Sequence, residues 1–445
     1  MEEVMDTRLQ RMLRNKIKRD GLINQFKAIY YCGSQVAHVP GLADGVYLLA
    51  NEKHAAFFGT TTCKSPWACP VCTAKRMSKY ATEIACAIDA LKQQGQVAFM
   101  LTLTVPHHRF MSCEETTEIL YNAWKQFIIH GNKRSNLTNN NKKKPNKVWK
   151  SRDVFASFCE EFNCIHRVRV CEYTWGKHGW HPHFHCLFWV DKAKLQQVVD
   201  WEQRLNERWL ALTRHYTLKQ WHKMRPEKFA QDEIRIQYLY SKKYTNGVSQ
   251  GAYISKDKNG KVITQESSMY ICGWGADKEL TGNIRMKATG KGHFTPHQIL
   301  ENAYKAKTTD DAEKWLNLFV EYMTATKKYR HARVNFSIHS GIKEIIRKWK
   351  LTNQYAETLK KKATFQMEDG GRWQTVFFFA SEEWYSICTL DETMNIKAEL
   401  LKLAVLEDAR RRIIDYLAQF NIDVSKARLD PTLSKAVEQI WHIAA

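Results

Sequence analysis

The chain has 445 residues, with 68 Lys and Arg against 46 Asp and Glu, and a formal net charge of +22. This excess of positive charge favours a polyanionic partner, although some basic proteins bind no polyanion. The 20 Phe, 15 Trp and 18 Tyr side chains can stack on bases, so they favour nucleic acid over a membrane surface. Neither a signal peptide nor an apolar run long enough to span a bilayer is evident, so we expect a cytoplasmic protein without a membrane partner.

A basic helix leads into a cluster of cysteines. Apolar residues recur at helical spacing over residues 5–29, among many Lys and Arg. The motif CKSPWACPVC and one cysteine upstream supply four thiolates, the closed set of a structural Zn²⁺ site: Cys32, Cys63, Cys69 and Cys72. A redox Cys-x-x-Cys pair is the competing interpretation, but it would not need Cys63. His38 or His54 remains an alternative to Cys32 as the fourth ligand.

The next segments alternate between predicted helices and a buried strand. Apolar residues at steps of three and four over 77–91 predict an amphipathic helix that ends near Gly95. The run VAFMLTLTV at 97–105 predicts a central strand, and 114–130 predicts a helix. Residues 131–152 form an Asn- and Lys-rich insertion without acidic residues. Four lysines there are candidate phosphate contacts, with a merely solvated loop as an equal alternative: Lys142, Lys143, Lys144 and Lys147.

Residues 166–190, HRVRVCEYTWGKHGWHPHFHCLFWV, predict a β-hairpin with a metal site. Both halves alternate in hydrophobicity, and the Gly-Lys-His-Gly sequence between them suits the connecting turn. In such a hairpin Glu172 lies across from, or diagonal to, His183 and His185 on one face. Two imidazoles and one carboxylate make a half-open site for a divalent cation. The alternative interpretation is a histidine-rich strand whose rings are packed or solvated.

The stretch GVSQGAYISKDK at 247–258 contains a candidate nucleophile. On a helix, Tyr253 and Lys256 would share a face, and a cation beside a tyrosine favours the phenolate that could attack a phosphate. The pair alone is a weak signal, because YSKKY upstream offers Tyr240 and Tyr244 as rivals. The alternation of apolar residues over 234–238 predicts a strand, which would pack Tyr240 and not present it.

Three motifs occur in order, FMLTLTVPH, GWHPHFHCLFWV and GAYISK, and the cysteine motif CKSPWACPVC precedes them. In this combination the chain resembles the single-tyrosine replication initiators of rolling-circle plasmids, in the HUH endonuclease superfamily, over roughly residues 30–345. The resemblance implies that His183 and His185 bind the metal, Mg²⁺ or Mn²⁺, that Tyr253 is the nucleophile, and that Lys256 assists it. Glu172 as third ligand rests on the hairpin argument and on the superfamily's use of an acidic or polar residue upstream.

The resemblance also implies a mechanism and a set of partners. Tyrosine attack on origin DNA leaves a 5′-phosphotyrosine and a free 3′-OH that primes synthesis, in a bacterial cytoplasm and without ATP. The implied partners are the plasmid origin, as hairpin single strand and as duplex, and the host helicase and DNA polymerase. Some relatives place a glutamate four residues before the tyrosine, where this chain has Ser249. The way in which a round of replication ends is therefore open.

The expected fold class is α+β, in three regions. Residues 1–95 hold the basic helix and the zinc module, and 96–300 hold an HUH domain with a central antiparallel sheet flanked by helices. Residues 301–445 are expected to be mostly helical, with one long amphipathic helix over 396–417, for origin binding, oligomerisation or core packing. Two rival functions remain: a non-catalytic zinc-dependent DNA-binding protein, and a metal-dependent phosphodiesterase that activates water.

Overall fold

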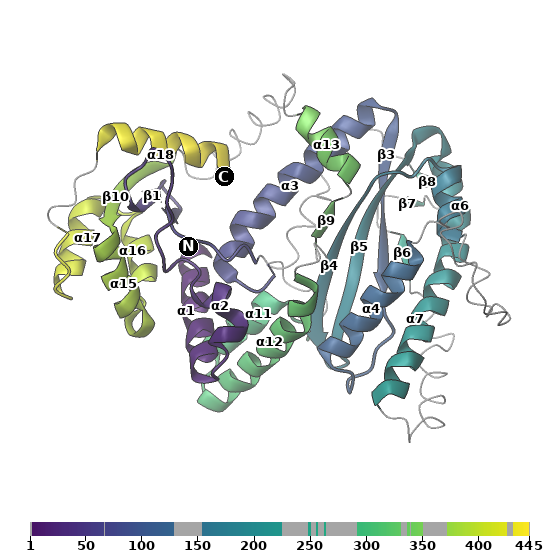
Figure 1. Ribbon diagram of the computed structural model, residues 1–445, viewed down its shortest axis with the longest axis horizontal. Coiled ribbons are helices and arrows are strands. Elements are labelled where there is room, and N and C mark those ends of the chain that lie inside the picture. The colour runs from purple at the N-terminus through teal and green to yellow at the C-terminus, as the bar shows by residue number, and fades with distance from the viewer. Residues whose placement is uncertain are drawn as a thin grey trace, which may run out of the picture. The chain divides into compact units, whose positions relative to one another are not determined.

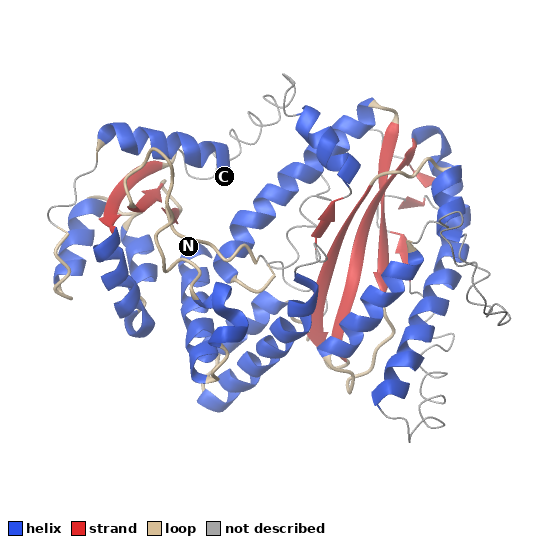
Figure 2. Cartoon of the chain, viewed as in Figure 1, coloured by secondary structure: helices blue, strands red, loops and turns tan. Residues whose placement is uncertain are grey.

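The computed structural model describes residues 2–65, 67–128, 154–224, 248–250, 255–256, 262–263, 292–330, 336–338, 340–349, 372–424 and 430–444. The chain forms two compact units that interleave along the sequence. Unit 1 comprises 1–80, 300–316 and 352–445, and unit 2 comprises 81–299 and 317–351. Both mix helices with antiparallel sheet, as Figures 1 and 2 show. Among the described residues no helix is long and apolar enough to cross a membrane.

Unit 2 is built on a five-stranded antiparallel sheet with the order β6-β3-β5-β4-β9. The strands are β3 (Gln96–Thr104), β4 (Arg167–Gly176), β5 (Gly179–Asp191), β6 (Val248–Gln250) and β9 (Phe336–Ile338). Strand β5 lies in the middle, between β3 and β4. The predicted hairpin is confirmed, because Gly176 pairs with Gly179 and leaves a two-residue turn between β4 and β5. A turn that short fixes the register of the whole hairpin.

One face of this sheet carries an aromatic core. Figure 1 shows α4 (Cys113–Phe127) and α7 (Glu202–Met224) beside the sheet, and α6 (Val154–Glu161) also contributes rings to this core. Phe184 of β5 packs against two rings of α4, with centroids 5.0 Å from Tyr121 and 5.5 Å from Trp124. Phe158 of α6 packs on Phe99 of β3. Since side chains alternate along a strand, this packing leaves His183 and His185 on the opposite face.

The remaining elements of unit 2 connect or flank this sheet. They are the larger part of α3 (Pro70–Gln93), the 3₁₀ helix η1 (Lys192–Trp201), the short pair β7 (Ser255–Lys256) and β8 (Val262–Ile263), the second half of α12 (Thr309–Arg330), and α13 (Ser340–Trp349). The predicted helices at 77–91 and 114–130 correspond to α3 and α4. The indole of Trp209 on α7 donates to the Thr104 carbonyl at 2.6 Å and so anchors the end of β3.

Unit 1 joins the N-terminal and C-terminal parts of the chain. Its sheet has the order β10-β1-β2, from β10 (Gln374–Ala380), β1 (Gly45–Ala50) and β2 (Ala55–Phe58). Its helices are α1 (Glu2–Arg19), α2 (Ile23–Tyr30), α15 (Ser381–Met394), α16 (Ile396–Leu403), α17 (Ala409–Ala418) and α18 (Pro431–Ala444), with α11 (Pro296–Lys305) crossing the boundary of the units. Phe377 and Phe379 of β10 are fully buried in its core, which explains the aromatic run in that strand.

Two predicted helices are each broken into two. The basic helix expected over 5–29 ends at Arg19, because Gly21 adopts a positive φ of 69°, and the chain restarts as α2. The long helix expected over 396–417 is likewise α16 and α17, separated where Asp408 has a φ of 55°. Apolar spacing alone missed both breaks, since the two helices on either side of Asp408 contribute to one core.

Candidate metal sites

The hairpin brings Glu172, His183 and His185 together on one face of the sheet. Glu172 pairs directly with His183 across β4 and β5, and His185 is two residues further along the same face. One carboxylate oxygen of Glu172 lies 3.0 Å from Nε2 of His183 and 3.3 Å from Nε2 of His185. The three ligand atoms lie within 4.8 Å of one another, so they could hold a single metal ion.

Neighbouring groups orient the two imidazoles. Thr102 of β3 pairs with His185, and its hydroxyl oxygen lies 3.0 Å from His185 Nδ1. The Nδ1–H of His183 donates to the His181 carbonyl at 3.4 Å. Both contacts occupy Nδ1 and leave Nε2 facing Glu172, the tautomer that a ligand histidine needs. The sequence did not indicate the role of Thr102, because 83 residues separate it from His185.

The environment keeps Glu172 ionised. Burial alone would raise the pKa of this carboxyl, but the imidazoles of His185 and His183 outweigh burial and hold the pKa of Glu172 well below its usual range. The side chains of all three residues are only 10–12% exposed. The site is therefore a largely desolvated carboxylate with two imidazoles, which offers three protein ligands among the described residues.

A second candidate metal site lies in unit 1 and consists of four cysteines. The sulfur atoms of Cys32, Cys63, Cys69 and Cys72 lie within 4.8 Å of one another, and the closest pairs are 3.5 Å apart. Tetrahedral ligands at about 2.3 Å from zinc would be about 3.8 Å apart, so the four sulfurs are close to the required spacing. Burial raises the pKa of the Cys69 thiol well above its usual value, so a bound cation is what would keep it deprotonated.

The structure gives the fourth place in this cluster to Cys32 and not to the histidine alternatives. His38 is exposed and contacts Asp44 at 3.1 Å, and neither it nor His54 belongs to the group. The Cys69 thiol donates to the Gln10 side chain of α1 at 3.3 Å, so the basic helix also contacts the cluster. A set of four thiolates leaves no open coordination position, which is typical of a structural site.

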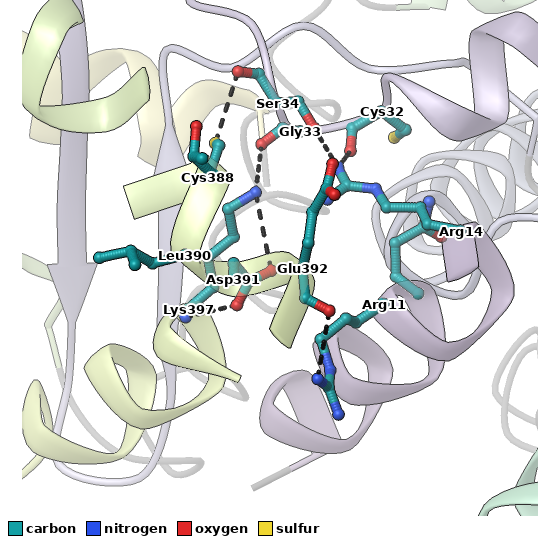
Figure 3. Close-up of polar contacts among 12 residues, drawn as sticks. Arg11, Arg14, Cys32, Gly33, Ser34, Cys388, Leu390, Asp391, Glu392 and Lys397 are labelled. Carbon is teal, nitrogen blue, oxygen red and sulfur yellow. Dashed lines mark hydrogen bonds and ion pairs between the residues drawn. The ribbon is translucent and has the colours of Figure 1, made fainter. Parts of the chain in front are cut away.

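Side chains from both ends of the chain hold residues 32–34, the segment that carries Cys32 (Figure 3). The guanidinium of Arg14, on α1, donates to the Cys32 carbonyl and the Ser34 hydroxyl. Lys397 of α16 donates to the Gly33 carbonyl at 3.1 Å, and the Cys388 thiol of α15 donates to the Ser34 carbonyl at 3.5 Å. All three carbonyls of this segment thus have side-chain partners. The sequence did not indicate this role of α15 and α16.

Lys397 is an unusual component of this clamp because it is a buried cation. It is 5% exposed, and its partner Asp391 is 2% exposed. The ammonium lies 4.0 Å from one carboxylate oxygen of Asp391, while the other oxygen accepts the backbone N–H of Lys397 at 2.9 Å. Burial lowers the pKa of Lys397. The ring of Trp384 lies 5.0 Å from the ammonium and completes its surroundings.

Two further histidines continue the row of rings that starts at the hairpin site. The ring of His181 lies 5.1 Å from that of His183, and His107 stacks on His181 at 4.8 Å with an interplanar angle of 16°. Burial lowers the pKa of both His107 and His181, so both are neutral at physiological pH. Neither residue was assigned a role from the sequence, although the alternation of β5 placed His181 on the face of the metal site.

Several predicted site residues lie outside the described residues. These are Tyr253, its rivals Tyr240 and Tyr244, and the four lysines Lys142, Lys143, Lys144 and Lys147. Lys256 is described, and the expectation that it lies on a helix is wrong: it is in β7, which pairs with β8. Val248 and Ile254 are β-branched, and Gly247 and Gly251 are poor helix formers, so the local sequence does not favour a helix there.

Ser249, which stands where some relatives of the resembling family have glutamate, lies on β6. It pairs with Thr102 of β3, which in turn pairs with His185 of β5, so these three residues occupy one row across the sheet.

Searches for a matching family model, a similar curated protein and a similar solved structure found nothing.

Proposed function

We propose that this protein initiates rolling-circle replication of a plasmid by nicking single-stranded DNA at the origin, with Tyr253 as the nucleophile. The observation that carries the proposal is the group of Glu172, His183 and His185 on the central hairpin of an antiparallel sheet. A rigid sheet face with two imidazoles, one ionised carboxylate and open coordination positions suits the binding of a phosphodiester oxygen.

Glu172, His183 and His185 would hold Mg²⁺ or Mn²⁺. The carboxylate and the open positions for phosphate oxygens suit these cations, and their choice beside two imidazoles rests on the resemblance to the HUH superfamily. The four thiolates of the cysteine cluster suit Zn²⁺. When bound, the cation at the hairpin supplies Lewis-acid activation of a non-bridging phosphate oxygen. The zinc of the cysteine cluster stabilises unit 1 and takes no part in the chemistry.

Strand β6 leads the chain toward the candidate nucleophile. Gln250 is the last residue of β6 and pairs with Leu101 of β3, the neighbour of Thr102. Tyr253 follows Gln250 by three residues, and a three-residue extended segment reaches about 11 Å at most. Because neighbouring strands are about 5 Å apart, β6 lies about 10 Å from β5, the strand that carries His183 and His185.

The reaction needs no external energy source. The Tyr253 hydroxyl loses its proton and attacks phosphorus, the bond to the 3′ oxygen breaks, and that oxygen takes up a proton as a free 3′-OH. The 5′ side remains attached as a phosphotyrosine ester, which preserves the energy of the phosphodiester for later rejoining. Host helicase and DNA polymerase would extend the 3′-OH. The net charge of +22 supports binding of the DNA backbone.

The test uses the full-length protein and single-stranded oligonucleotides tiled across hairpins in the DNA that flanks its gene. With Mn²⁺, a 5′-labelled substrate should yield a shortened product, and a 3′-labelled substrate should yield a protein-linked band on a denaturing gel. Tyr253→Phe should abolish both, whereas Tyr240→Phe and Tyr244→Phe should keep both.

The rival functions give different patterns in the same experiment. A phosphodiesterase that activates water would shorten the 5′-labelled strand without any protein-linked band. A non-catalytic DNA-binding protein would give neither product. A Tyr253→Phe protein that still forms the linked band would show that another residue is the nucleophile, and an adduct peptide within 238–245 would assign it to Tyr240 or Tyr244.

A further inference from the structure

The loop between β3 and α4 exposes a large apolar ring near the hairpin site. Phe110 is 69% exposed, whereas its neighbour Met111 and Val105, at the start of the loop, are buried at 4% and 1% exposure. An isolated exposed Phe is ordinary, but this one stands between cationic and aromatic neighbours. The guanidinium of Arg109 lies 4.6 Å from the Phe110 ring centroid, and the His108 ring lies 4.9 Å from it.

The loop has a defined conformation. The Nδ1–H of His107 donates to the Val105 carbonyl at 3.1 Å, and the Met111 N–H donates to the His108 carbonyl at 2.8 Å. Gly179, at the start of β5, has a φ of 88°, and a Cβ added there would lie 3.1 Å from the Arg109 Cα. The loop therefore packs closely against the hairpin turn, and these contacts fix the backbone that carries the exposed Phe110 ring.

A row of rings links the metal site to this loop. His185 and His183 have centroids 4.9 Å apart, His183 and His181 are 5.1 Å apart, and His181 and His107 are 4.8 Å apart. The strand register also places the loop beside the metal site, because Thr104, the last residue of β3, pairs with His183 and the loop begins at the next residue. The row thus leads from the hairpin site to the loop that carries Phe110.

We propose that the His107–Phe110 loop is a stacking platform for a base of the single-stranded DNA a few nucleotides from the nicked phosphate, with Arg109 contacting the backbone beside that base. This proposal rests on the proposed function and names the part of the substrate that the site recognises. Bases of a single strand have open faces that a phenyl ring can cover, whereas the bases of a duplex are stacked on each other. Stacking accepts any base, so the platform positions the strand and does not read its sequence.

The test measures binding without cleavage, in buffer without added Mg²⁺ or Mn²⁺. Fluorescence anisotropy compares two labelled probes of equal length and charge, a dT20 oligonucleotide and a 20-mer of abasic sites. Phe110→Ala should weaken binding of dT20 by about 5- to 150-fold, the range for losing one stacked base, and should leave binding of the abasic strand unchanged. Phe110→Trp should retain dT20 binding, and its added indole fluorescence should be quenched by dT20.

Tyr385 supplies a matched control, because it is an exposed aromatic ring of 74% exposure on α15 in unit 1. Tyr385→Ala should bind both probes as the wild type does. Equal affinity of Phe110→Ala and wild type for dT20 would overturn the proposal, as would an equal loss on both probes, which would indicate a lost backbone contact or a structural defect.

The outcome is separable from that of the proposed function. If the wild type forms the tyrosine adduct and Phe110→Ala binds dT20 normally, the stacking proposal alone fails. If no adduct forms but Phe110→Ala loses only base-dependent binding, stacking holds and the nicking proposal fails.

Discussion

Replacing Lys397 with Met removes the buried ammonium and keeps most of the side-chain volume. In the wild type this group donates to the Gly33 carbonyl at 3.1 Å and faces the Asp391 carboxylate at 4.0 Å. The variant leaves Asp391 buried without its cation. Removing one partner of a buried ion pair costs about 3–5 kcal/mol, and the 4.0 Å separation places this pair at about 3 kcal/mol. We therefore expect Lys397→Met to destabilise unit 1 by this amount.

The same change should loosen the cysteine site. Lys397 contacts Gly33, the residue after Cys32, and losing a group that orients a metal ligand typically costs 10–100-fold in metal affinity. Two assays follow the effect: hydrogen exchange of the amides of α16, and zinc retention against a competing chelator. Exchange should accelerate by about 150-fold, the equivalent of about 3 kcal/mol, and zinc should be lost at roughly 10-fold lower chelator concentration.

Two control variants make this prediction refutable. Lys402→Met, on the same helix, removes a 36% exposed lysine that pairs with Glu399 at 2.8 Å, and it should change stability by less than about 0.5 kcal/mol. Lys397→Met combined with Asp391→Asn no longer buries an uncompensated charge and should recover most of the loss. If the single variant exchanges and retains zinc like the wild type, or if the double variant is no better than the single one, the reasoning from the buried pair is wrong.

Two further predictions concern the metal sites. His183→Ala should lower nicking by at least about 100-fold and leave duplex binding nearly intact, because scattered Lys and Arg supply most of the affinity. Glu172→Ala should weaken the dependence of nicking on the metal, but less completely than His183→Ala does. Normal cleavage by His183→Ala with a chelator present would mean that this site is structural. Cys69→Ser should abolish the tightly held zinc, expected at about one per chain, and expose unit 1 to proteolysis; unchanged zinc content by metal analysis would contradict the four-cysteine site.

The hairpin site could be predicted because its geometry is local. The alternation of 166–190 identified two strands, and a two-residue turn between Gly176 and Gly179 sets every pair that follows. Glu172 therefore falls opposite His183 without any knowledge of the rest of the fold. The cysteine site could be predicted for a different reason: the donor chemistry of four thiolates leaves few alternatives, even though Cys32 is 31 residues before Cys63.

The groups that support the two sites could not be predicted, because they come from distant parts of the chain. Thr102 reaches His185 only because β3 is the neighbour of β5, and strand order is not encoded in the pattern of any one strand. Lys397 contacts Gly33 across 364 residues. Its spacing in the sequence is that of an amphipathic helix, and nothing local distinguishes this buried lysine from the partly exposed Lys402 on the same helix.

The donor arrangement of the hairpin explains why an open site can be held ready there before any ligand binds. Adjacent ligands of an octahedral cation with bonds of about 2.1 Å are about 3.0 Å apart. The Glu172 oxygen already lies 3.0 and 3.3 Å from the two Nε2 atoms, so the three donors stand near the spacing that coordination requires. All three donors come from one sheet face, so among the described residues they would hold a cation from one side only, and the proposed function uses the other side for a phosphate. The four cysteines instead form a closed donor set around one point. For this reason we propose that the cysteine site stabilises the fold, whereas the one-sided hairpin site takes part in catalysis.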